Sequence, residues 1–130
     1  MRISLDTNAY SDLKRGTRWV REVATASEVR ICATVLGELR FGFGIGKGKA
    51  KNLRELQEFL DDPVVSQAVI GDSTAILYGD LKRYLRAKGT PIPENDIWIA
   101  ASCVEDGAVL LTSDRHFERL PQVSVIWPEE

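Results

Sequence analysis

The stretch RISLDTNAYSDLKRG, residues 2–16, decides the fold. Its apolar residues Ile3 and Leu5 alternate with polar ones and predict a short strand that ends at Asp6. Residues 8–14 then predict a short helix, which Gly16 ends. A buried strand that turns directly into a helix is typical of an α/β protein.

The same alternation of strand and helix continues along the chain. Further strands are expected at residues 29–32, 64–70, 108–111 and 123–126. Further helices are expected at residues 18–26, from an N-cap at Thr34, at 50–61, from Asp72 or Ser73 to Gly89, and at 94–105. This order predicts an α/β fold with a mostly parallel central sheet and helices on both faces.

Length and composition describe an ordinary globular chain. Its 130 residues predict one domain, residues 1–130, and 44% hydrophobic with 28% charged residues gives enough apolar material for a core. No apolar run reaches the roughly 20 residues of a bilayer span, so we expect a cytoplasmic protein without a membrane partner. Cys32 and Cys103 are too few for a disulfide scaffold or a zinc site and are interpreted as core thiols.

Four acidic residues fall where strands lead into helices. Asp6 ends the first strand, Glu38 lies about one turn into a helix, Asp96 opens another, and Asp114 follows the strand at 108–111. In parallel sheets the ligand site lies beyond the carboxyl ends of the strands. Each acid also has a structural alternative: Asp96 and Asp114 as helix caps, Glu38 in a surface ion pair, and Asp6 in an Asx turn.

Convergence of these acids would require a positive charge among them. Two carboxylates about 4 Å apart repel by roughly 4 kcal/mol at an effective dielectric constant near 20. Oxygen ligands without cysteine or histidine suit Mg²⁺ or Mn²⁺ better than zinc. Such an ion can activate a water and stabilise charge on a phosphate that is being displaced.

Four motifs give the chain a family resemblance. They are LDTN at residues 5–8, TVLGEL at 34–39, NDIWIAA at 95–101 and LTSDRHF at 111–117, followed by VIW at 125–127. In order and spacing they resemble the motifs of PIN-domain nucleases, and among these the VapC toxins of toxin–antitoxin pairs. The resemblance covers essentially the whole chain and implies a PIN-like three-layer fold.

The resemblance also implies an activity. It implies a Mg²⁺- or Mn²⁺-dependent endoribonuclease that cuts structured RNA, such as tRNA or ribosomal RNA, to leave a 5′-phosphate. By position, Asp6, Glu38, Asp96 and Asp114 are then the catalytic, metal-binding acids, and Thr7, Asn8 and Ser113 are the residues that support them. The implied partners are a cognate VapB-like antitoxin and a second copy of the chain.

A glycine-rich, basic tract occupies residues 41–51, FGFGIGKGKAK, and departs from the usual pattern of the family. Its alternating glycines are expected to prevent a continuous helix, so residues 42–48 are interpreted as a mobile flap or a plain exposed loop. No phosphate-binding glycine motif is present. Because the net charge of the chain is only −2, RNA contact is expected from a local patch, namely Arg40, Lys47, Lys49, Lys51 and Arg54.

Of two other possible functions, a binding module stays open and a phosphatase is improbable. A non-catalytic RNA- or protein-binding module would keep the fold without cleavage. A phosphoaspartate phosphatase needs Asp-x-Asp after the first strand, but Asn8 takes the second position. The lone His116 excludes a ribonuclease that uses two histidines, and packing or solvent exposure is the favoured role of this residue.

Trp19 and Trp98 are interpreted as core or interface aromatics.

Overall fold

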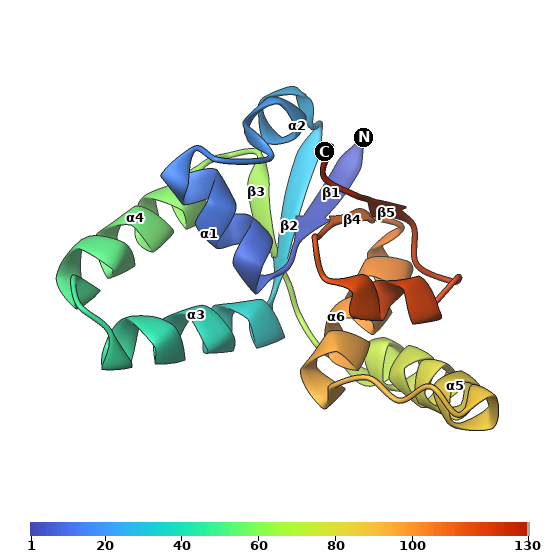
Figure 1. Ribbon diagram of the computed structural model, residues 1–130. Coiled ribbons are helices and arrows are strands. Elements are labelled where there is room, and N and C mark those ends of the chain that lie inside the picture. The colour runs from blue at the N-terminus through green and yellow to red at the C-terminus, as the bar shows by residue number, and fades with distance from the viewer. Residues whose placement is uncertain (130) are drawn as a thin grey trace.

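The computed structural model, which describes residues 1–129, is built on a parallel sheet. Its strands are β1 (Arg2–Leu5), β2 (Glu28–Cys32), β3 (Val65–Ala68), β4 (Val109–Leu111) and β5 (Val125–Ile126). They lie in the order β3-β2-β1-β4-β5, and every neighbouring pair is parallel (Figure 1). The predicted mostly parallel sheet is confirmed.

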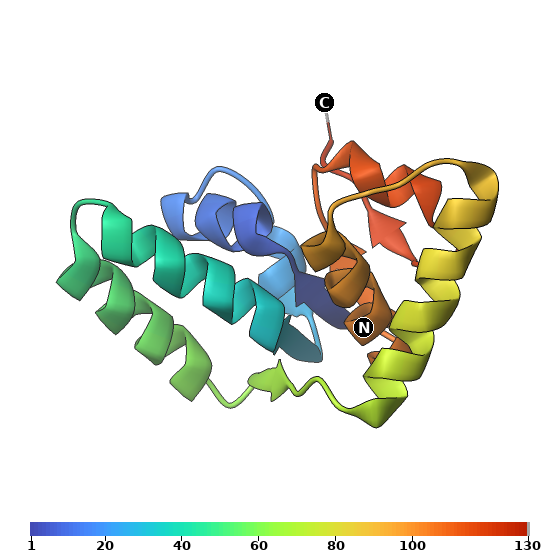
Figure 2. The ribbon, with the colours of Figure 1, turned by 90° about the horizontal axis from the view of Figure 1, so that it is seen from below.

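Helices connect each strand to the next. They are α1 (Thr7–Arg15), α2 (Val20–Thr25), α3 (Ala33–Ile45), α4 (Lys49–Asp61), α5 (Asp72–Lys88) and α6 (Glu94–Asp106), with a 3₁₀ helix η1 (Arg115–Arg119) after β4. Right-handed crossovers put helices on opposite faces when the direction of travel across the sheet reverses. Accordingly α1, α3 and α4 gather on one side of the molecule and α5 and α6 on the other (Figures 1 and 2).

The core lies on both sides of the strands. Ile3, Leu5, Ile31 and Leu110 are all at most 2% exposed, as expected for a parallel sheet covered on both faces. The two predicted core thiols are confirmed as buried and free. No helix among residues 1–129 is long and apolar enough to cross a bilayer.

Helix α3 differs from the sequence prediction at both ends. It begins at Ala33 with Cys32 in the cap position, so the expected N-cap at Thr34 is wrong, and Thr34 lies inside the first turn. It also continues through Gly42 and Gly44 to Ile45, so the loop expected at residues 42–48 is wrong for 42–45 and correct for 46–48, which separate α3 from α4. Val35, Leu39 and Phe43 form an apolar stripe packed on the core, and this packing outweighs the low helix propensity of glycine.

The sheet reverses direction between β1 and β4. From β1 the chain moves outward to β2 and β3, then returns to place β4 on the other side of β1. Leu5 and Leu111, the last residues of β1 and β4, lie opposite one another. Ligands of open α/β sheets bind beyond the strand ends at such a reversal. The residues after Leu5 and Leu111 are therefore the first candidates for a functional site.

Candidate active site

Asp6 is the most deeply placed acid of the site. It directly follows β1, caps α1 by accepting a hydrogen bond from the Ala9 amide at 2.8 Å, and is only 6% exposed. The Thr112 hydroxyl, from the end of β4, donates to its Oδ2 atom. Asp6 is therefore both a helix cap and a fixed carboxylate at the sheet edge.

Glu38 is held over the same edge by its two polar neighbours. It lies in the second turn of α3, where the Thr7 hydroxyl donates to Oε1 at 2.6 Å. The Asn95 amide donates to Oε2 at 3.4 Å. Thr7 follows Asp6 and Asn95 precedes Asp96 in the chain, so these bonds link Glu38 to the neighbours of two other acids.

Asp96 and Asp114 meet at the only histidine of the chain. The Nδ1 atom of His116 lies 3.0 Å from Asp96 Oδ2 and 3.0 Å from Asp114 Oδ1. Asp114 caps η1 by accepting the His116 backbone N–H at 2.9 Å. One ligand atom from each of these three residues lies within 4.8 Å of the other two, which is close enough to share an ion.

The buried carboxylates are held in an environment that disfavours their charge. Burial raises the pKa of Asp6, and the nearby charges of Asp114 and Asp96 raise it further, against the hydrogen bonds from Thr112 and Ala9. Burial also raises the pKa of Asp96, with Asp114 and Glu38 acting in the same direction. A cation among these groups would relieve both effects.

The donor set fits a divalent cation. Among residues 1–129, no ion pair joins a Lys or Arg to Asp6, Glu38, Asp96 or Asp114, so basic side chains do not neutralise the cluster. Carboxylate oxygens are the preferred ligands of Mg²⁺ and Mn²⁺. Asp96 and Asp114 thus lie close enough to share an ion, and Asp6 and Glu38 lie near them at the carboxyl edge of β1 and β4.

The structure distributes the supporting residues differently from the sequence prediction. Thr7 does contact an acid, whereas no hydrogen bond within residues 1–129 uses the Asn8 or Ser113 side chain. Thr112 and Asn95 make contacts of this kind and were not predicted as site residues. The strand register could have indicated Thr112, since it follows Leu111 as Asp6 follows Leu5; no local pattern indicates that His116 turns toward Asp96.

A groove of about 680 Å³ lies beside α3 and includes Glu38 but none of the other three acids. It is lined by Thr7, Thr34, Gly37, Glu38, Phe41 and Asn95. The residues predicted to contact RNA, Arg40, Lys47, Lys49 and Lys51, are exposed near the far end of α3 and the start of α4. Lys51 lies 3.8 Å from Glu55, so part of its charge is compensated.

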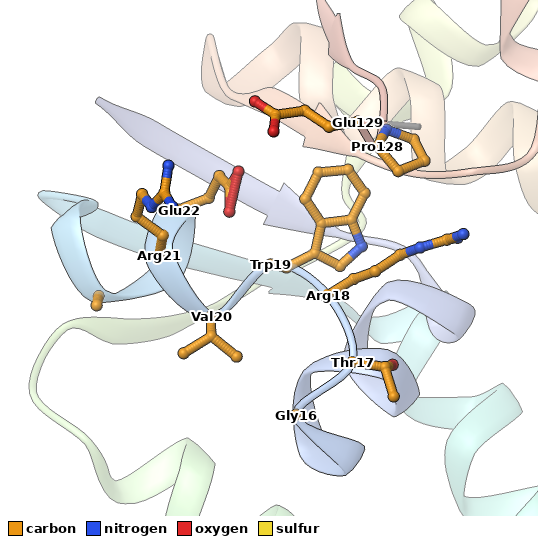
Figure 3. A pocket seen from close by; sticks show the side chains of 10 residues that line it. Gly16, Thr17, Arg18, Trp19, Val20, Arg21, Glu22, Pro128 and Glu129 are labelled. Carbon is orange, nitrogen blue, oxygen red and sulfur yellow. The ribbon is translucent and has the colours of Figure 1, made fainter.

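A second cavity of about 540 Å³ lies at the opposite edge of the sheet, beside α2 and the end of the chain (Figure 3). Trp19 lies at its centre, is 5% exposed as predicted for a core aromatic, and has a positive φ of 71°. Charged side chains of both signs line it, namely those of Arg18, Arg21, Glu22 and Glu129. This cavity contains none of the four acids.

Comparison of the chain with known protein families agrees with this arrangement. The PIN domain family model matches residues 3–123. With a five-stranded parallel sheet and four acids at its carboxyl edge, the chain belongs to the PIN-domain family, and the predicted fold is confirmed.

Individual similar proteins indicate a narrower class than the family model does. The chain is 29% identical over 121 residues to ribonuclease VapC4 of Mycobacterium tuberculosis, covering 93% of this chain and 92% of the relative. It is 32% identical over 105 residues to ribonuclease VapC2 of Rickettsia felis, covering 78% and 75%. The crystal structure of VapBC2 from Rickettsia felis, bound to a promoter DNA fragment, superposes with a TM-score of 0.86 at 26% identity, covering 99% of this chain and all of that one. The resemblance to VapC proteins is thereby confirmed.

Proposed function

We propose that this protein is a toxin-type endoribonuclease that hydrolyses phosphodiester bonds in structured RNA with the help of Mg²⁺ or Mn²⁺. The observation that carries the proposal is that Asp96 and Asp114 lie close enough to share an ion, with Asp6 and Glu38 near them at the same sheet edge. Among residues 1–129, no Lys or Arg pairs with any of these four acids. The similarity to proteins named ribonuclease VapC supports the same activity.

Each acid has a separate task in this proposal. Asp96 and Asp114 would hold the cation, and Asp6 would complete its negative surroundings from a position fixed by Thr112. Glu38, aligned by Thr7, would orient the attacking water in line with the phosphate. When bound, the divalent cation supplies a water of lowered pKa and stabilises the charge that develops on the phosphate.

Cleavage by the purified chain tests the activity. The substrates are mixed tRNA and ribosomal RNA, incubated with Mn²⁺, with Mg²⁺ or with a chelator. We expect cleavage with either ion, none with chelator, and none for Asp6→Asn or Asp96→Asn. Asp80→Asn on the exposed face of α5 is the matched control and should cut normally. Full activity of both site variants would contradict the proposal.

Sequencing of the new RNA ends addresses the substrate. A tRNA anticodon loop or a ribosomal RNA loop is the proposed target, and each cut should leave a 5′-phosphate. The exposed Arg40, Lys47, Lys49 and Lys51 are proposed to hold the RNA backbone. Replacing Lys47 and Lys49 by Gln should then weaken RNA binding most at low salt, because phosphate contacts release counterions.

The alternative of a non-catalytic binding module remains testable in the same assay. It predicts RNA binding that resists chelation and no ion-dependent cleavage of any RNA. The acids would then have no metal to bind, and Asp96→Asn would leave RNA binding unchanged.

An antitoxin is the proposed protein partner. Several structural neighbours are VapBC assemblies, including the DNA-bound complex of Salmonella typhimurium, which has a TM-score of 0.82 and 28% identity. The uncompensated acids would attract a basic side chain of such a partner. Induction of the chain alone should arrest growth, and Asp6→Asn should remove the arrest; harmless accumulation of the unmodified chain would count against a toxin.

A homodimer is the proposed assembly. Phe41 and Ile45 are 69% and 74% exposed and lie four residues apart on α3, a spacing that puts them on one face of the helix. Such residues are typical of interaction surfaces. Light scattering after gel filtration should give twice the mass of the chain, and Phe41→Ser with Ile45→Ser should lower it if this face is the interface.

A further inference from the structure

We infer that His116 is itself a ligand of the divalent cation and makes the site favour Mn²⁺ over Mg²⁺. The inference rests on the proposed function, since it assigns one more residue to the proposed metal site. It differs from the sequence interpretation, in which His116 packs or faces solvent.

The geometry around the imidazole carries the inference. Its Nδ1 atom faces Asp96 Oδ2 and Asp114 Oδ1 at 3.0 Å each. Ligand atoms about 2.1 Å from one ion are about 3.0 Å apart at a right angle and about 4.2 Å apart when opposite. The three atoms lie within 4.8 Å of one another, so a small adjustment brings all of them to a single ion.

The backbone of η1 keeps the ring in this place. The His116 amide donates to Asp114 Oδ1, so the histidine and its neighbouring ligand are fixed to each other. Among residues 1–129, the polar partners of the ring are the two carboxylates alone. An ion that contacts both carboxylates occupies the space that Nδ1 faces. The ring must therefore coordinate that ion, with its proton on Nε2, or move away.

Coordination has a consequence for the choice of ion. Mg²⁺ favours oxygen ligands in a strict octahedral arrangement, whereas Mn²⁺ binds imidazole nitrogen more readily. A site with one nitrogen and several carboxylate oxygens is thus better suited to Mn²⁺. A site made of the four acids alone would lack this preference.

Pulsed electron paramagnetic resonance of bound Mn²⁺ reads the ligand directly. The chain has one histidine, so in protein without a histidine tag any imidazole nitrogen coupled to Mn²⁺ belongs to His116. We expect a ¹⁴N modulation in the echo envelope, replaced by a ¹⁵N signal after labelling with ¹⁵N-histidine. Bound Mn²⁺ without nitrogen modulation would overturn the inference.

Calorimetric titrations with Mn²⁺ and Mg²⁺ give the second readout. His116→Ala should weaken Mn²⁺ binding by about tenfold or more and Mg²⁺ binding by less than about threefold. The side chain is 42% exposed, so the variant is expected to fold, which circular dichroism verifies. Glu118→Gln, an exposed residue of the same 3₁₀ helix, is the control and should bind both ions normally. Equal losses for both ions, or none, would contradict the inference.

Asp96→Asn and Asp114→Asn separate this inference from the proposed function. If both variants bind Mn²⁺ as the unmodified chain does, the proposed metal site itself fails. If they lose Mn²⁺ but the unmodified chain shows no nitrogen coupling, the metal site stands and only the role of His116 fails.

Discussion

Asp6 and Thr112 are joined across two neighbouring strands by a buried hydrogen bond, in which the Thr112 hydroxyl donates to the Asp6 carboxylate. Thr112 is fully buried, and its oxygen also accepts the Asp114 amide N–H at 2.9 Å. One hydroxyl group therefore positions two of the four acids. The bond exists because Leu5 and Leu111 pair in register, which places the next residue of each strand side by side.

Replacing Thr112 by valine should remove this coupling without leaving a cavity. The variant leaves Asp6 and the Asp114 amide without their partner, and unpaired buried groups cost about 1–3 kcal/mol. We expect the free energy of unfolding in urea to fall by about that amount. Thr112→Ser keeps the hydroxyl and should lose less stability. Equal stability of the valine variant and the unmodified chain would show that the bond contributes nothing.

The pH dependence of stability should reveal the raised pKa of Asp6. The unfolded carboxyl has a pKa near 3.9, and burial raises the folded value above it. Between these values the folded chain binds more protons than the unfolded chain, so the contribution of Asp6 to stability falls as pH rises through this window and stays low at neutral pH. Asp96 contributes with the same sign.

Asp6→Asn removes the charge that burial disfavours and still caps α1 through its one oxygen. We therefore expect it to stabilise the metal-free chain at pH 7, although its amide group no longer accepts the Thr112 hydroxyl. The gain should shrink as pH falls toward 4. Urea unfolding with a chelator at both pH values measures it, and Mn²⁺ should stabilise the unmodified chain more than the variant. A variant that is less stable than the unmodified chain at pH 7 would contradict the argument.

Glu38 gives a prediction about catalysis. Its rotamer depends on the Thr7 hydroxyl at 2.6 Å, so Thr7→Val should leave the fold intact and misalign the carboxylate. Loss of an orienting partner typically lowers activity by about 10–100-fold. In RNA cleavage assays we expect this loss in kcat with little change in KM, and restoration by Thr7→Ser. A valine variant with full kcat would show that Thr7 does not orient Glu38.

Local sequence patterns were sufficient for the sheet and for the four acids. Strands such as residues 2–5 have short apolar alternation followed by turns, and parallel strands end at a common edge, so the place of Asp6 and Asp114 followed from topology alone. The comparisons confirm the family that the motifs indicated. What sequence could not supply was the contact partners, because these depend on strand register and side-chain direction.

Thr112 and His116 are site residues whose contacts the sequence did not predict, each for a different reason. Thr112 needs the register of β1 against β4, which no single segment of the chain contains. His116 needs the turn of η1, a 3₁₀ helix capped by Asp114 that brings the ring back over α6. The helix break expected in residues 42–48 begins only at residue 46 for a related reason, since propensity is local and the packing of Phe43 is not.

The continuous helix α3 leads to a last prediction about its glycines. Gly44 lies inside the helix with φ outside the positive range, and a Cβ atom built on it meets nothing within 4 Å. Alanine there should raise the free energy of unfolding by about 0.5–1 kcal/mol, because glycine loses more backbone freedom on folding. Gly89→Ala is the matched control: Gly89 has a φ of 68° at the end of α5, so alanine there should destabilise. If Gly44→Ala destabilises as Gly89→Ala does, α3 ends before Gly44 in solution, and the loop that carries Lys47 then begins earlier in the chain. If it stabilises the chain but slows RNA cleavage, the flexibility of this glycine is used in substrate binding.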